Sequence, residues 1–177
     1  MGLTILNINK KAEQPIGARL YVSAPPEYLY AAVLDIRGFP SWAPGVRRVA
    51  IVEGPVGPVM VSEWEVSVLG LRRKVRSVLE EAEPFGFLRW SYDGPVMGWG
   101  QCEISALGDG ATAAFTTELS PKEPALNKLV GIAAASGAAT IHLKRCLARL
   151  GQTVSETGGF RVVSNQPSDV GRQLLPG

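Results

Sequence analysis

The chain carries little net charge, few cysteines and a single histidine. Its formal net charge is +2 over 177 residues, so no overall basic field favours nucleic acid, and no helix gathers the Lys and Arg that a groove-reading element needs. Cys102 and Cys146 fit no CxxC spacing and fall on different expected elements, which indicates free buried thiols rather than a disulfide or a metal site. We therefore expect no nucleic-acid partner, no metal and no cofactor.

Long hydrophobic runs are also lacking. No segment approaches the roughly 20 apolar residues needed to span a bilayer, and residues 1–17 have neither the apolar core nor the small-residue cleavage site of a secretion signal. A chain that is 46% hydrophobic and 19% charged is long enough to bury about 70% of its unfolded surface in one core. These features predict one soluble, cytoplasmic domain without integral membrane association, and they name no protein partner.

The most informative segment is residues 22–49, a short helix between two strands. Pro25 and Pro26 suit the first turn of this helix, where a missing N–H costs nothing. A glycine and a proline end the helix. Phe39 and Trp42 then place two large aromatic side chains on a tight connection before the next strand.

Nine positions in this segment form a recognisable pattern: Ala24, Pro26, Glu27, Asp35, Phe39, Pro40, Trp42, Pro44 and Val46. On these residues the chain resembles the START-like, Bet v 1-type (SRPBCC) superfamily, in its branch of polyketide cyclase/dehydrase and lipid-transport proteins. The resemblance spans about residues 15–150. It leaves residues 1–14 as an N-terminal extension and residues 151–177 as a C-terminal tail.

The rest of the chain is typical of an antiparallel meander followed by a helix from about residue 124 to 150. The expected strands cover residues 16–23, 46–53, 58–68, 71–80, 87–92, 97–106 and 111–119. With the resemblance, this order predicts an α+β helix-grip fold: a seven-stranded antiparallel curved sheet wrapped around a long C-terminal helix, with two short helices after the first strand. We expect the tail to be mobile; the alternative is that its apolar cluster at residues 160–163 adds to a sheet edge or covers a cavity mouth.

The charge pattern sets the register of one hairpin. A two-residue turn at residues 69–70 places glutamates opposite cations on one face and apolar side chains on the other. The charged face then points to solvent and the apolar face points inward. The predicted pairs are Glu65–Lys74 and Glu63–Arg76 outside, and Trp64–Val75 and Val66–Arg73 inside.

The long helix has small side chains in the middle of its apolar side, opposite tryptophans of the sheet. Two interpretations stand: close packing of helix on sheet, or a cavity for an apolar ligand, which the resemblance favours. The predicted walls are Trp64, Val66, Val75, Trp90 and Tyr92 from the sheet and Leu129, Ala133, Ser136 and Thr140 from the helix, with Phe39 and Trp42 as a lid or mouth.

Few residues of the predicted cavity can catalyse. Alternation turns Arg73 inward, where its guanidinium meets a carbonyl or acid group of a ligand or instead extends along the surface. His142 falls on the polar side of the helix and is assigned to solvent. No carboxylates converge inward, and Tyr92 is the one inward side chain with a usable proton. We predict no catalytic residue.

Three functions are consistent with the sequence. The first is a carrier or binding protein for a small hydrophobic molecule such as a lipid, a quinone or a polyketide-like compound. The second is a cyclase- or dehydratase-like enzyme that uses the same cavity, with Tyr92 or Arg73 orienting a carbonyl. The third is an interaction module that acts through an outer surface at Arg72, Lys74 or Arg76 and has a filled interior.

Overall fold

The computed structural model of the protein describes residues 15–68, 70–155 and 159–164. Within those ranges the chain forms eight strands in a single antiparallel sheet, together with four α-helices and one 3-10 helix. In chain order the elements are β1 (Ile16–Val22), α1 (Pro26–Leu34), η1 (Ile36–Gly38), α2 (Phe39–Trp42), β2 (Val46–Glu53), β3 (Val61–Val68), β4 (Leu71–Glu83), β5 (Phe87–Asp93), β6 (Val96–Leu107), β7 (Gly110–Pro121), α3 (Pro124–Ala135), α4 (Ala138–Val154) and β8 (Phe160–Ser164).

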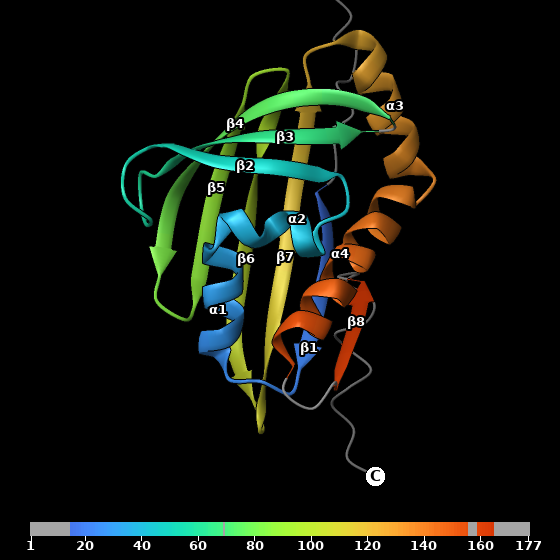
Figure 1. Ribbon diagram of the computed structural model, residues 1–177. Coiled ribbons are helices and arrows are strands. Elements are labelled where there is room, and N and C mark those ends of the chain that lie inside the picture. Colours follow the sequence, from blue (N-terminus) through green and yellow to red (C-terminus); the bar gives the residue numbers. More distant parts are fainter. Residues whose placement is uncertain (1–14, 69, 156–158, 165–177) are drawn as a thin grey trace, which may run out of the picture.

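The sheet is strongly curved, and its strand order is β2-β3-β4-β5-β6-β7-β1-β8. Figure 1 shows β2, β3 and the start of β4 running across the long strands β6 and β7, so that the sheet encloses a concave side. Helices α1 and α2 lie over part of that side, and α3 and α4 run along its open flank. The predicted helix-grip fold is confirmed.

The short helices after β1 follow from local sequence. Pro26 occupies the first turn of α1, and the helix buries Leu29, Tyr30 and Val33. The chain then turns through η1 into α2, where the side chain of Trp42 is only 4% exposed. These helices therefore carry their aromatic side chains into the concave side of the sheet.

The hairpin of β3 and β4 has the register that its charges predict. Glu63 lies opposite Arg76, and Trp64 lies opposite Val75. On the outer face, however, the ion pair of Arg76 is not with Glu63. Its guanidinium donates to Glu53 of β2 at 2.8 Å. Leu69, the first residue of the predicted turn, lies outside the described residues.

The predicted strand count of seven is wrong, because part of the expected tail forms β8 beside β1. Three contacts hold this strand: Phe160 packs over Gly151 of α4, the backbone N–H of Ser23 donates to the carbonyl oxygen of Gly159 at 2.9 Å, and the Arg161 guanidinium lies 4.7 Å from the ring centroid of Tyr21. The apolar cluster thus extends the sheet edge. The remaining tail and residues 1–14 lie outside the described residues.

The long C-terminal helix is interrupted. Helix α3 ends at Ala135, and α4 begins at Ala138 after a turn in which Gly137 has a φ of +76°. Only glycine adopts that left-handed conformation without steric strain. The helix also continues to Val154, four residues beyond its expected end. No helix in the described part of the chain is long and apolar enough to cross a membrane.

The main core lies between the sheet and helices α1 and α4. A smaller cluster of Val75, Val96 and Leu126 packs beneath α3, and Leu126 is the one fully buried residue among those assigned to that helix. Helix α4 is therefore anchored deeply and α3 lightly. The largest fully buried side chains of the main core are Leu20, Leu29, Met60, Leu88, Leu147 and Leu150.

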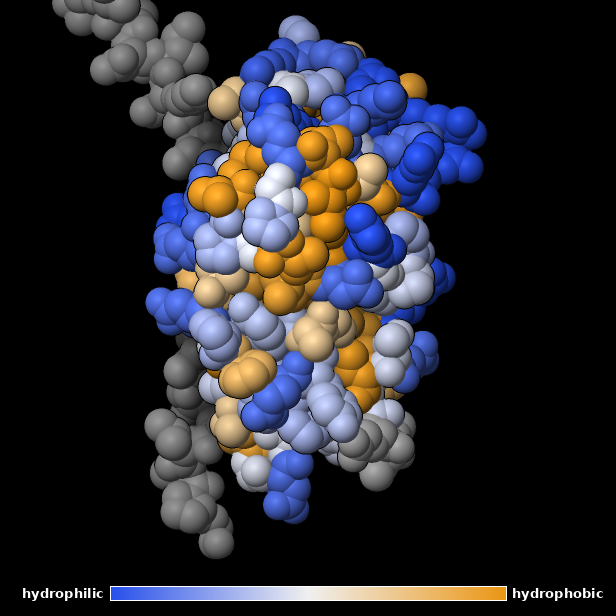
Figure 2. Space-filling model, turned by 60° about the vertical axis from the view of Figure 1, so that its left-hand side comes forward, coloured by the Kyte–Doolittle hydropathy of each residue, from blue (hydrophilic) through white to orange (hydrophobic). Residues whose placement is uncertain are grey.

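Apolar side chains also reach the surface around the β2–β3 connection. Val52, Val56 and Val59 are each at least 45% exposed there. Figure 2 brings the left-hand side of Figure 1 forward and shows hydrophobic side chains gathered near the middle of that face, bordered by hydrophilic ones. None of these three valines lines the internal cavity described below.

The anchoring of α4 can be tested by truncating one buried and one exposed residue of the same helix. Leu150 is 0% exposed and Ile141 is 52% exposed. We expect Leu150→Ala to lower the free energy of unfolding by about 2–5 kcal/mol, because it removes core contacts and leaves a void. Ile141→Ala should cost about 0.5 kcal/mol or less. Urea unfolding curves measure both; equal losses would contradict this packing of α4.

Candidate functional site

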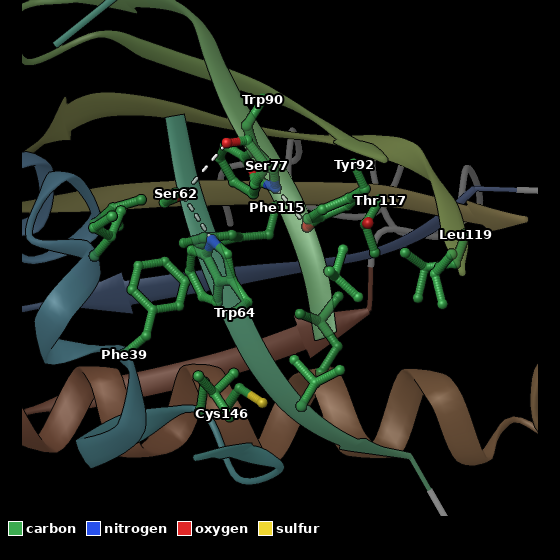
Figure 3. Close-up of a pocket in the computed structure, with 18 of the residues that line it drawn as sticks. Phe39, Ser62, Trp64, Ser77, Trp90, Tyr92, Phe115, Thr117, Leu119 and Cys146 are labelled. Atoms are coloured by element: carbon green, nitrogen blue, oxygen red, sulfur yellow. Dashed lines mark hydrogen bonds between the residues drawn. The ribbon is translucent and has the colours of Figure 1, made fainter. Parts of the chain in front are cut away.

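An internal cavity of about 300 Å³ lies between the concave face of the sheet and the helices. Its walls come from β3, β4, β5 and β7 on one side and from α2, α3 and α4 on the other. The volume is at the lower end of the range of small-molecule pockets. Figure 3 shows Phe39 and Trp64 at one side, Thr117 and Leu119 at the other, and Cys146 of α4 opposite the sheet.

Most of the wall residues predicted for the sheet and the short helices line this cavity. They are Phe39, Trp42, Trp64, Val66, Val75, Trp90 and Tyr92. Strand β7, from which no wall residue was predicted, contributes Phe115, Thr116, Thr117 and Leu119. Alternation along each strand explains this outcome, because every second side chain of a strand points to the same face.

Three aromatic side chains form one end of the cavity. The ring centroids of Phe39 and Trp42 are 4.1 Å apart, and those of Phe39 and Trp64 are 4.8 Å apart with the rings nearly perpendicular. The Trp64 indole N–H donates to the Ser62 hydroxyl at 2.8 Å. This bond satisfies the only polar atom of the indole. The aromatic end therefore presents apolar ring surface to a ligand.

Two hydrogen bonds lie at the other end of the cavity. Trp90 donates its indole N–H to the Tyr92 hydroxyl, and the Thr117 hydroxyl donates to the carbonyl oxygen of Trp99 at 3.0 Å. Burial raises the pKa of Tyr92, while the side chains of Trp90 and Thr117 oppose that rise, so the phenol is neutral.

Gly100 makes room for this arrangement. A Cβ built on Gly100 would lie 2.5 Å from atoms of the Trp90 indole, a distance that no side chain tolerates. The sequence carries a pair of glycines, Gly98 and Gly100, on either side of Trp99. The glycine at position 100 lets the Trp90 ring pack against the backbone of β6.

The prediction of which helix residues line the cavity is wrong. Leu129, Ala133, Ser136 and Thr140 do not line it, and the Ser136 side chain is exposed. The reason is the break at Gly137, because one projection at 100° per residue cannot be carried through a left-handed residue. The helix residues that line the cavity are Leu126, Val130, His142, Leu143, Cys146 and Leu147.

Arg73 does not line the cavity either. Its Nε donates to Glu123 Oε1 at 3.0 Å and its Nη2 to Glu123 Oε2 at 2.8 Å. The hydrogen bond to Glu123 raises the pKa of Arg73. This two-pronged pair joins β4 to the residue that precedes α3. Alternation alone misplaced the side chain, because it takes no account of a carboxylate 50 positions along the chain.

His142 and Cys146 lie one helical turn apart at the helix side of the cavity. The His142 ring is exposed, as predicted, but it also borders the cavity, and its Nε2 lies 3.7 Å from Cys146 Sγ. Burial raises the pKa of the Cys146 thiol to about 11. Near neutral pH the sulfur is therefore a protonated thiol and a poor nucleophile.

The cavity lacks charged side chains apart from any charge on His142. Among the residues the structure describes, no Asp, Glu, Lys or Arg lines it. The same part of the chain contains no group of three or more side chains placed to hold a metal ion. The chemistry available is apolar contact and neutral hydrogen bonding.

Comparison with known proteins adds a family and a set of similar folds. The family model described as "Polyketide cyclase / dehydrase and lipid transport" matches residues 18–155. No curated protein matches the chain significantly. Among solved structures, a START superfamily protein from Mycobacterium smegmatis is similar with a TM-score of 0.63 at 17% identity, over 79% of this chain and 96% of that one.

Two further structures in this group carry the name of aromatase/cyclase. The Zhui aromatase/cyclase from Streptomyces sp. R1128 has a TM-score of 0.65 at 15% identity, over 82% of this chain and 98% of that one. The di-domain ARO/CYC protein BexL from the BE-7585A biosynthetic pathway has a TM-score of 0.63 at 15% identity, over 80% of this chain and 50% of that one. At these identities the likeness shows the fold.

The state of Cys146 is open to a direct chemical test. We expect iodoacetamide to alkylate Cys146 slowly near neutral pH and faster as the pH rises toward about 11, because only the thiolate reacts. Between pH 9.0, the ordinary pKa of a thiol, and about pH 11, the Cys146 thiol is ionised in the unfolded chain but protonated in the folded one. Unfolding therefore releases a proton in this range, and the free energy of unfolding should fall as the pH rises through it. Peptide mass mapping separates Cys146 from Cys102. Rapid alkylation at neutral pH would mean that His142 ionises the thiol.

Proposed function

Because the chain belongs to the polyketide cyclase / dehydrase and lipid transport family, we propose that it binds a small apolar molecule in the cavity, as a carrier or binding protein. The observation that carries this proposal is the partly open cavity of about 300 Å³ between sheet and helices. The third function considered, a surface interaction module with a filled interior, loses its premise because of this space.

The walls of the cavity account for the affinity that such a protein needs. Burial of apolar ligand surface contributes about 25 cal/mol per Å², less the cost of ordering the ligand. Phe39, Trp64 and Trp90 supply rigid aromatic surface, and their positions are fixed by ring contacts and hydrogen bonds. Little side-chain freedom is then lost when a ligand enters.

The polar groups favour binding over catalysis. A general acid or base needs a proton that it can exchange with the substrate. Burial raises the pKa values of the Tyr92 phenol and the Cys146 thiol, so both groups hold their protons near neutral pH. No carboxylate among the described residues lines the cavity to act beside them.

The proposal is tested with two tryptophan substitutions on α3, one at a residue that lines the cavity and one at a residue that does not. Val130 lines the cavity and Ala133, three residues further on the same helix, does not. We expect Val130→Trp to abolish binding, because the indole occupies the ligand's space, and Ala133→Trp to leave binding unchanged. Mass spectrometry of organic extracts from the purified proteins, beside titration with neutral fluorescent apolar probes, measures both.

Two outcomes would contradict the binding proposal. The first is an empty wild-type protein that also fails to bind any apolar probe. The second is equal binding by the wild type and Val130→Trp, which would place the ligand outside the cavity. Melting curves of both variants serve as the control for folding, since Val130→Trp must retain the cooperative transition of the wild type.

A cyclase-like enzyme is the second candidate, and the Tyr92 hydroxyl inside the cavity is the observation that favours it. Two structures of similar fold are named aromatase/cyclases. If the chain is an enzyme, Tyr92→Phe should abolish turnover of a linear poly-β-ketone while binding persists. If it is a carrier, as proposed, the product mixture should be the same with wild type, with Tyr92→Phe and without protein. Chromatography of the products distinguishes the two.

A further inference from the structure

The described part of the chain places no fixed charge against the cavity. Its lining residues include no Asp, Glu, Lys or Arg. Strand alternation turns one cation, Arg73, toward this side. Its Nε and Nη2 groups donate to the carboxylate of Glu123 at 3.0 and 2.8 Å. A third donor of Arg73 bonds the carbonyl oxygen of Arg72 at 2.9 Å. The guanidinium is therefore not available to a ligand.

The polar side chains on the sheet side of the cavity are mostly paired with one another. Trp64 donates to Ser62, and Trp90 donates to Tyr92. The Thr117 hydroxyl donates to the carbonyl oxygen of Trp99. The two indole N–H groups and the Thr117 hydroxyl are therefore engaged within the wall, while the Tyr92 hydroxyl accepts the bond from Trp90.

Two more hydroxyl side chains line the cavity, Ser77 of β4 and Thr116 of β7. Ser77 is the more deeply buried, at only 4% exposed, and lies beside the apolar neighbours Val75 and Leu79. Within the described residues, Ser77 accepts a hydrogen bond from Ser62 at its backbone oxygen, while its own hydroxyl has no partner. A hydroxyl that faces an apolar cavity without a partner is less stable than a satisfied one. A ligand atom that accepts its proton would restore that bond.

From these observations we infer that the ligand is uncharged and carries a neutral oxygen acceptor, such as a ketone carbonyl, that the Ser77 hydroxyl binds. This inference rests on the proposed binding function and narrows its ligand class. It excludes carboxylates, fatty-acid anions included. A carboxylate in this cavity would lose its hydration without gaining a cation, so its desolvation would go uncompensated.

The experiment compares three naphthalene compounds of nearly the same shape. The probes are 2-acetylnaphthalene, which is a neutral ketone, 2-naphthoate, which is its charged counterpart, and 2-ethylnaphthalene, which has no oxygen. Isothermal titration of the full chain near neutral pH gives the three dissociation constants. We expect the ketone to bind at least about 100-fold more tightly than the carboxylate, and the hydrocarbon to bind more weakly than the ketone.

Ser77→Ala tests the assigned donor. We expect this variant to bind the ketone about 2- to 10-fold more weakly, because one neutral hydrogen bond is lost, and to bind the hydrocarbon as the wild type does. Ser105→Ala is the matched control, since Ser105 is exposed on β6 and does not line the cavity. It should change neither affinity. Equal ketone affinity in wild type and Ser77→Ala would overturn the role of Ser77.

His142 is the group at the rim that could receive an anion, so His142→Gln is included. Tyr92 and Cys146, the other titratable groups that line the cavity, have pKa values raised by burial and stay neutral. Naphthoate binding as tight as ketone binding would overturn the neutral-ligand inference, whether or not it requires His142. Failure of all three probes to bind would instead overturn the proposed binding function itself, and thus the two failures are distinguishable.

Discussion

The contact between the Trp90 indole and the backbone of β6 at Gly100 determines how the polar end of the cavity is built. With any side chain at position 100 the indole would have to move. Its N–H would then leave the Tyr92 hydroxyl. Beside this bond, the Thr117 hydroxyl of β7 donates to the Trp99 carbonyl of β6. The cavity can therefore contain an indole N–H and a threonine hydroxyl and still present an almost entirely apolar wall, because these donors are engaged within the wall.

The sheet side of the site could be predicted from the sequence, since its rules are local. Alternation placed Trp64, Val75, Trp90 and Tyr92 on one face, and opposite charges on neighbouring strands set the register of β3 and β4. The tight connection at residues 39–42 could be predicted because prolines and glycines mark where the helices begin and end. The role of Gly100 was missed, because a contact with a ring on the neighbouring strand has no signature in a single sequence.

The helix side could not be predicted in the same way. A helical projection holds its phase only while the helix is continuous, and the left-handed Gly137 resets it between α3 and α4. The four helix residues predicted for the wall, Leu129, Ala133, Ser136 and Thr140, do not line the cavity, whereas Leu126, Val130, Leu143 and Leu147 do. The pairing of Arg73 with Glu123 and the addition of β8 to β1 depend on contacts between distant segments. Local patterns do not encode such contacts.

The two sides of the cavity thus play different physical parts. The sheet fixes the chemistry, because its hydrogen bonds, ring contacts and close glycine leave each lining group one position. The helices set the size, and they do so unequally: α4 buries Leu147 and Leu150 completely, whereas α3 is held by Leu126 and by the Arg73–Glu123 pair at its start. The less buried of the two helices, α3, thus closes the cavity beside the Arg73–Glu123 pair, which lies outside the lining. Fixed charge is in this way used to attach the helix to the sheet, while the described lining residues carry no Asp, Glu, Lys or Arg.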